Sequence, residues 1–124
     1  MAVMASRDTR TFIAGEDLSS AQFKFVTLEP GGQVDLADSA GENAIGVCIA
    51  GGAAGAAVTV AVSGKVMVEA GGAITAGDQI QTGADGTALL AATGDVVLGY
   101  ALEDGVDGQR IAIEMIQGGN VVPA

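Results

Sequence analysis

Short runs of alternating apolar and polar residues, separated by turn residues, constrain the fold of this sequence more than any other feature. The runs are FKFVTLE (23–29), QVDLA (33–37), AVTVAVSG (57–64), KVMVEA (65–70) and RIAIEMI (110–116). Alternation of this kind, bounded by Gly, Asp and Asn, is typical of half-buried β-strands. No segment keeps a helical period over about eleven residues. The pattern predicts an all-β fold, either a small β-sandwich or a small β-barrel.

A weak internal repeat runs through these strands. The segment Gln33–Val62 can be laid over Gly86–Met115 without a gap, and glycines and apolar residues then coincide. The coinciding pairs include Leu36 with Leu89, Gly46 with Gly99, and Val58 with Ile111. We therefore expect one quasi-repeated strand unit to be used twice. The stretch Ala70–Gly86 is expected to be a strand-turn link between the copies, with bends at AGD and GADG around the alternating run QIQ (79–81), since it has no phosphate-loop motif and no helix follows it.

The repeat also bears on the one segment with the hydropathy of a membrane span. Ala44–Gly64 contains no charged residue. The part of the second copy that matches Ala50–Ala57 contains four charged residues, Glu103, Asp104, Asp107 and Arg110. Such charges are costly inside a bilayer, so both copies are expected to be soluble hairpins, and no membrane contact is expected.

Composition narrows the possible functions. The chain has 15 acidic and 5 basic residues, whereas binding to nucleic acid needs a basic surface. It has no histidine and a single cysteine, Cys48, which excludes Ser-His-Asp triads, Cys-His pairs and intramolecular disulfides. We therefore expect no enzyme activity, no cofactor and no metal site. Aromatic residues make up only 3% of the chain, so the core is expected to be thin, which favours oligomerisation.

Two stretches leave a different binding function open as an alternative. Glu103–Glu114 has residue types of a calcium loop at several positions, but Gly105 stands where a ligand oxygen is needed. Lys65 lies in VSGKVMVEA, which could form a hairpin turn of the kind that exposes the modified lysine of lipoyl and biotinyl domains. The alternative function is therefore a soluble β-module that binds calcium or carries a covalent group.

The N-terminal residues differ in charge from the rest of the chain. Residues 1–12 contain Arg7 and Arg10 and only one acid, Asp8, so they carry a net charge of +1 in a chain whose net charge is −10. A polar segment of this kind can become ordered on a partner. We expect an extended N-terminal arm over residues 1–14, a β-domain over 15–118 and a C-terminal tail over 119–124.

Four segments carry a family resemblance through their order and spacing. They are RTFIAGEDL, GGQVDLADSAGENAIGVCIAG, VSGKVMVEAGGAITAGDQIQTGADGTALLAA and VLGYALEDGVDGQRIAIEMI. Together they cover roughly Thr9 to Ile116 and resemble the small capsid cement, or head decoration, proteins of tailed bacteriophages. The resemblance implies a non-enzymatic β-protein that binds the outside of an assembled capsid and stabilises the joints between its subunits.

The same resemblance implies partners and a location. The partners would be the major capsid protein and further copies of this chain, in a dimer or a trimer. The protein would be made in the host cytoplasm and would end on the outer capsid surface of the virion. Four residues of the N-terminal arm are the candidates for capsid contact: Arg7, Asp8, Arg10 and Phe12.

Overall fold

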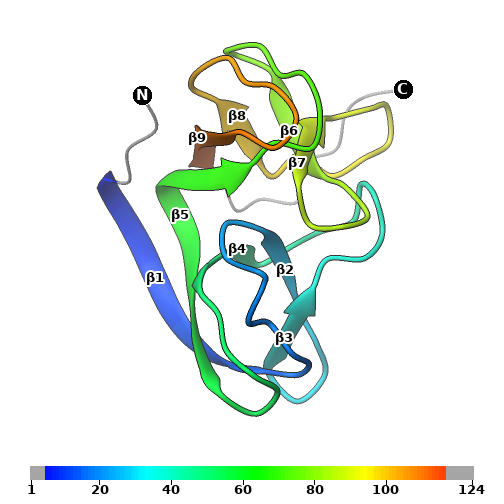
Figure 1. The fold of residues 1–124 in the computed structure, drawn as a ribbon. Helices are drawn as coiled ribbons and strands as arrows, with labels where there is room; N and C mark the ends of the chain where they lie inside the picture. Colours follow the sequence, from blue (N-terminus) through cyan, green and yellow to red (C-terminus); the bar gives the residue numbers. More distant parts are fainter. Residues whose placement is uncertain (1–4, 117–124) are drawn as a thin grey trace.

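Every regular element in the computed structural model, which describes residues 5–116, is a β-strand. The strands are β1 (Ala5–Ala14), β2 (Phe25–Leu28), β3 (Gln33–Leu36), β4 (Gly46–Ala50), β5 (Ala57–Glu69), β6 (Gln79–Thr82), β7 (Ala88–Leu90), β8 (Gly99–Ala101) and β9 (Arg110–Met115). The prediction of an all-β fold is confirmed (Figure 1). Within these residues, no helix has the length and apolar character needed to cross a membrane.

Five of the strands close into a barrel. The sheet order is β1-β3-β2-β4-β5-β9-β8-β6-β7, and β1 pairs a second time with β5. This second pairing is antiparallel and extends along β1 from Ala5 to Ile13. The pairing of β1 with β3 is parallel and involves only Ile13 and Ala14 of β1. The chain therefore forms a β-barrel, one of the two predicted architectures, with four further strands outside it.

Strand β5 belongs to two sets of strands. It is 13 residues long, and its first half pairs with β1 and β4. Its second half, Gly64–Glu69, pairs with β9, and β8, β6 and β7 follow. A single parallel bridge between Ala70 and Ala88 joins the end of β5 to β7. The second half of β5 and the four outer strands thus form a second ring, which only this bridge closes.

The two rings repeat one architecture. We call residues 5–62 the first unit and residues 64–115 the second unit. The strands of the two units correspond in order and in pairing. In the first unit the order along the chain is β1, β2, β3, β4 and the first half of β5. In the second unit the corresponding strands are the second half of β5, β6, β7, β8 and β9. Loop hydrogen bonds recur too: Leu18 N–H to Gly52 C=O at 2.8 Å, and Ile74 N–H to Gly105 C=O at 3.0 Å. The predicted internal repeat is confirmed, except that its register at β3 was wrong by one residue: Leu36 lies opposite Val26 and Leu90 opposite Ile80, so Leu36 corresponds to Leu90 and not to Leu89.

The repeat extends further toward the N-terminus than the sequence indicated. Ala70–Gly86 is not a link between copies but an integral part of the second unit, where it corresponds to residues 14–32. Phe23 and Gly77, for example, both have a positive φ, of 66° and 92°. The N–H groups of both donate to corresponding carbonyls of β4 and β8, at 2.7 and 2.8 Å. The sequence comparison missed this part because the spacing between corresponding residues changes along the chain.

Each unit has an apolar core built from corresponding positions. The core of the first unit includes Leu18, Val26, Cys48, Val58 and Val60. The corresponding residues Ile74, Ile80, Ala101, Ile111 and Ile113 lie in the core of the second unit. Phe25, Val47 and Ala61 of the first unit also pack into this second core, so the two units fold as one body.

Two corresponding glycines provide a test of the repeat. A Cβ at Gly46 would collide with the carbonyl oxygen of Ala61, and a Cβ at Gly99 with the carbonyl oxygen of Glu114. We predict that Gly46→Ala and Gly99→Ala each lower the free energy of unfolding by about 1–3 kcal/mol, because backbone must shift. Chemical denaturation measures the change.

Gly72→Ala is the matched control. A Cβ at Gly72 would make only an ordinary contact, at 3.5 Å, with the side chain of Leu89. This variant should be as stable as the parent protein or slightly more stable. Equal stability of all three variants would contradict the close strand packing described here.

Candidate functional site

The four predicted contact residues all lie on β1, which runs past the core of the first unit. On the side of β1 that faces the core, Ala14 is buried, Phe12 is half-buried and Arg10 and Asp8 are exposed. On the other side Thr9, Thr11 and Ile13 are exposed. The side chains of residues 8–11 are therefore exposed on both faces of β1. On the edge of β1 that pairs with β3 at Ile13 and Ala14, residues 8–11 have no strand partner among the described residues.

Asp8 and Arg10 pair with each other on this exposed stretch. The guanidinium of Arg10 lies 2.9 Å from the carboxylate of Asp8, and the two side chains are 58% and 53% exposed. Such a pair contributes little to stability, so both groups can be used by a partner at small cost. Phe12 packs instead against the first core. The side chain of Arg7 lies outside the described part, and contact of these residues with a capsid stays a prediction.

The division of the chain into arm, domain and tail also stays a prediction, although its first part has a clear position. Residues 5–14 form β1, a strand of the closed barrel. The expected tail, residues 119–124, lies outside the described residues.

Lys65 is not at a hairpin turn. It lies in the middle of β5, with Ala5 on one side and Glu114 on the other, and it is half-buried. The suggested exposed tip for a lipoyl- or biotinyl-type modification is therefore wrong, because VSGKVMVEA is continuous strand.

The suggested calcium loop uses its acidic side chains to order the backbone. A carboxylate oxygen of Glu103 accepts the N–H of Ala112 at 2.8 Å, and one of Asp104 accepts the N–H of Ala76 at 2.8 Å. Within residues 5–116, no group of three or more potential metal ligands is placed to hold an ion.

The aspartates of Ala70–Gly86 have a similar structural role. Asp78 accepts the N–H of Thr75 at 2.8 Å, and Asp85 accepts the hydroxyl of Thr87 at 2.6 Å. The bond from Thr87 lowers the pKa of Asp85. The interpretation of this stretch as turns fits these contacts.

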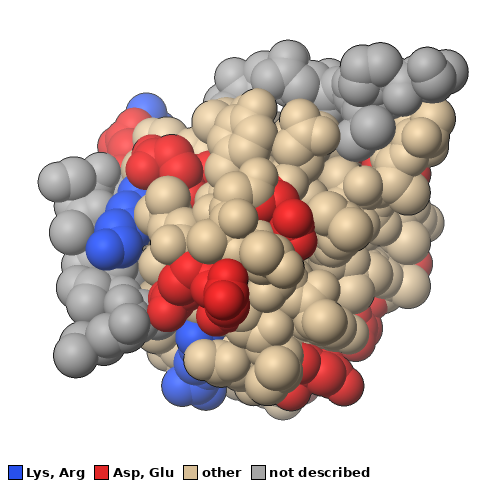
Figure 2. All heavy atoms as spheres, turned by 90° about the horizontal axis from the view of Figure 1, so that it is seen from above, with Lys and Arg blue, Asp and Glu red and all other residues tan. Residues whose placement is uncertain are grey.

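An acidic surface lies along β2 and β3 of the first unit. Oxygen Oδ1 of Asp35 is buried and has no hydrogen-bond partner in the described part of the chain. Burial, followed by the nearby negative charges of Glu16, Glu29 and Asp38, raises the pKa of the Asp35 carboxyl. In the view from above, Lys and Arg side chains lie in separate places on the left of the molecule, with Asp and Glu side chains beside them (Figure 2).

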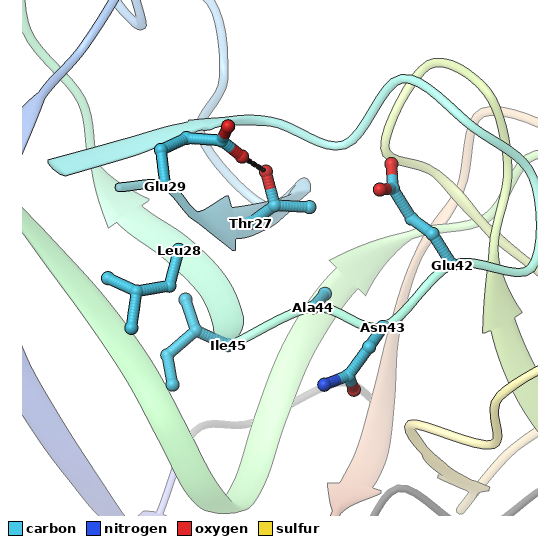
Figure 3. A pocket seen from close by; sticks show the side chains of 7 residues that line it. All are labelled: Thr27, Leu28, Glu29, Glu42, Asn43, Ala44 and Ile45. Atoms are coloured by element: carbon cyan, nitrogen blue, oxygen red, sulfur yellow. Dashed lines mark hydrogen bonds between the residues drawn. The ribbon is translucent and has the colours of Figure 1, made fainter. Parts of the chain in front are cut away.

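Beside this acidic surface the structure has a cavity that the sequence did not predict. It has a volume of about 360 Å³ and lies between the end of β2 and the segment before β4 (Figure 3). Its lining residues are Thr27, Leu28, Glu29, Glu42, Asn43, Ala44 and Ile45. We call it the β2 groove. Leu28 is 50% exposed, so the groove combines an apolar wall with the carboxylates of Glu29 and Glu42.

Both carboxylates of the β2 groove are held in place. Glu29 accepts the hydroxyl of Thr27 at 2.6 Å, which Figure 3 shows as a dashed line. Glu42 accepts the N–H groups of Asp38 and Ser39, both at 2.9 Å. The sequence contains one signal for this region. Residues 27–29 (TLE) differ in type from residues 81–83 (QTG), which correspond to them in the second unit. The repeat found in the sequence begins only at Gln33, so this difference was not visible there.

These surfaces belong to an all-β protein with an exposed strand and a groove. Comparison with known proteins gives the family: the chain belongs to the phage cement protein family, whose model matches residues 7–115. It is therefore a phage structural protein associated with the capsid, and its family is not a class of enzymes.

A solved structure supports the same fold. The N base of the head fiber gp8.5 of bacteriophage phi29 matches with a TM-score of 0.72 and 21% sequence identity. The match covers 93% of this chain and 98% of that chain. No curated protein matches the sequence.

The raised pKa of Asp35 makes stability depend on pH. Folded Asp35 keeps its proton to higher pH than unfolded Asp35, whose pKa is near the ordinary value of about 3.9. The folded state therefore loses stability as pH rises through this range, and the loss is complete above the raised pKa. We predict that Asp35→Asn stabilises the protein at pH 7.

Thermal unfolding from pH 3 to pH 8 measures this effect. The gain should shrink as pH falls and disappear below the ordinary pKa of aspartate. Asp107→Asn, at an exposed carboxyl of the β8–β9 loop, is the control and should show no comparable trend. A gain for Asp35→Asn that is constant over the whole range would contradict the assignment.

Proposed function

We propose that this protein is a capsid decoration protein that binds the outer surface of the major capsid shell and stabilises the joints between capsid subunits. The observation that carries the proposal is the family match over residues 7–115. In this proposal the protein is made in the host cytoplasm, acts as a homo-oligomer and becomes part of the virion. It binds neither nucleic acid nor membrane.

The physical basis is linkage between binding and assembly. A capsid under internal pressure fails when its subunits separate, and a protein that binds only the joined state stabilises that state by its binding free energy. An oligomer that contacts several subunits gains further through avidity. The net charge of −10 suits a protein outside the shell, where it does not compete for packaged DNA.

Binding to capsids is the direct test. We expect the purified protein to cosediment with expanded capsids and to raise the temperature at which they release DNA. Bovine serum albumin, at equal concentration, controls for trapping in the pellet. If the protein stays in the supernatant with both expanded and unexpanded capsids of its own phage, the proposal is wrong.

We further propose that the exposed stretch of β1 contributes to capsid contact. Deletion of residues 1–12 would remove most of a barrel strand, so a point substitution is the better test. Arg10→Glu should weaken capsid binding about tenfold, because a charge that contacts a partner is reversed. The readout is the apparent dissociation constant in cosedimentation.

Lys24→Glu is the control for Arg10→Glu. It changes the net charge of the chain by the same amount at a half-buried site outside β1. If the two variants bind equally, β1 makes no specific contact. Circular dichroism and unfolding curves should show that both variants are folded.

A further inference from the structure

The internal repeat identifies what the β2 groove is shaped to bind. In the first unit a carbonyl of β2 accepts an N–H from the segment before β4, and in the second unit a carbonyl of β6 accepts an N–H from the segment before β8. These bonds are Ile45 N–H to Val26 C=O at 2.9 Å, and Leu98 N–H to Ile80 C=O at 2.7 Å. The two segments separate two residues beyond this bond. The separation lies between Leu28 and Asn43 in the first unit and between Thr82 and Val96 in the second unit. The β2 groove is the space at this separation in the first unit.

In the second unit a loop of the first unit fills the corresponding space. The N–H of Gly41 donates to the carbonyl of Thr82 at 2.9 Å, and the carbonyl of Gly41 accepts the N–H of Val96 at 3.0 Å. Gly41 thus joins the two separated segments with one donor and one acceptor. A Cβ at Gly41 would collide with the carboxylate of Asp95, and the φ of 80° at this position also favours glycine.

The loop of the second unit that corresponds to the Gly41 loop fills no groove within residues 5–116. It has the same turn: Gly41 and Gly94 have φ values of 80° and 87°. The closing bonds are Glu42 N–H to Ser39 C=O at 3.2 Å and Asp95 N–H to Ala92 C=O at 3.0 Å. A Cβ at Gly94 would have no neighbour within 4 Å. The described part of each chain therefore has one open groove and one free loop of the kind that fills such a groove.

We propose that the β2 groove of one copy binds the Gly94 loop of a second copy. The N–H of Gly94 donates to the carbonyl of Leu28, and its carbonyl accepts the N–H of Asn43. Glu42 of the groove lies against Gly94 in the way that Asp95 lies against Gly41. The occupant is a second copy because this chain carries the matching loop, in the same turn.

The contact is of the head-to-tail kind. The groove lies in the first unit and the loop in the second, so each copy can give a loop to one neighbour and accept a loop from another. Such an interface closes into a ring if the rotation between copies permits, and a ring is the arrangement that offers several capsid contacts at once. The inference deepens the homo-oligomer of the proposed function, but it does not depend on capsid binding.

Glycine substitutions that keep the turn test the loop. Gly94→Asn adds a side chain that the groove cannot hold, and asparagine tolerates a positive φ better than most residues. Gly108→Asn is the matched control, since Gly108 has a φ of 84° and a Cβ there would also have no neighbour within 4 Å. Sedimentation equilibrium without capsids should give a dissociation constant for self-association that is about tenfold or more higher for Gly94→Asn only.

A substitution in the groove tests the other side of the contact. Leu28→Arg fills the apolar wall of the groove and places its guanidinium near Glu29 and Glu42. Val106→Arg is its control, because Val106 is 64% exposed in the β8–β9 loop, away from the groove. Leu28→Arg should weaken self-association as Gly94→Asn does, and Val106→Arg should not.

The results distinguish this proposal from the capsid function. A wild-type protein that stays monomeric at every accessible concentration overturns the groove contact, whatever its capsid binding. So does a Gly94→Asn protein that associates as the wild type does. If the wild type is monomeric and Leu28→Arg loses capsid binding, the occupant is a capsid loop and the second-copy proposal is wrong. If the wild-type protein self-associates, its binding to capsids is measured in a separate cosedimentation experiment.

Discussion

Strand β5 is the element on which the rest of the structure depends. Its first half closes the barrel of the first unit by pairing with β1 and β4, and its second half begins the second unit by pairing with β9. Backbone hydrogen bonds on both edges fix its position, while its side chains alternate between the cores and the surface. A flexible linker would leave the two copies free to move relative to each other, whereas one shared strand sets their orientation.

One residue at the junction between the units has an unfavourable backbone conformation but makes contacts that join them. Phe23 has a φ of 66°, a region that costs a side-chain-bearing residue about 1–2 kcal/mol. Its ring lies 4.5 Å from the guanidinium carbon of Arg110 in β9, and its carbonyl accepts the N–H of Glu69 at 2.8 Å. The corresponding residue of the second unit is Gly77, which has no ring to place. The strain at Phe23 is thus offset by contacts that join the two units.

Duplication also explains why each of the two units keeps a different site unfilled. A unit in the middle of a repeated structure has both of its interaction sites filled, whereas the two ends of a two-unit chain each keep one site open. Here the open sites are the β2 groove and the Gly94 loop, and the exposed stretch of β1 lies at the N-terminal end. Surfaces left open in this way are natural places for a protein to bind its own copies or a lattice.

The sequence by itself determined the all-β class, the approximate positions of β2, β3, β5 and β9 and the existence of a repeat, because these depend on local alternation and on turn residues. It also led to the phage cement family through the order of its turns. It placed Lys65 in a turn, which was wrong because periodicity does not say whether two adjacent runs form one strand. It also placed Ala70–Gly86 between the copies, which was wrong because the spacing between corresponding residues changes along the chain. Tertiary structure alone decided that β5 is shared, that Gly41 fills a groove of the second unit and that the β2 groove is open. Those features arise from pairing between residues far apart in the chain, which no local pattern encodes.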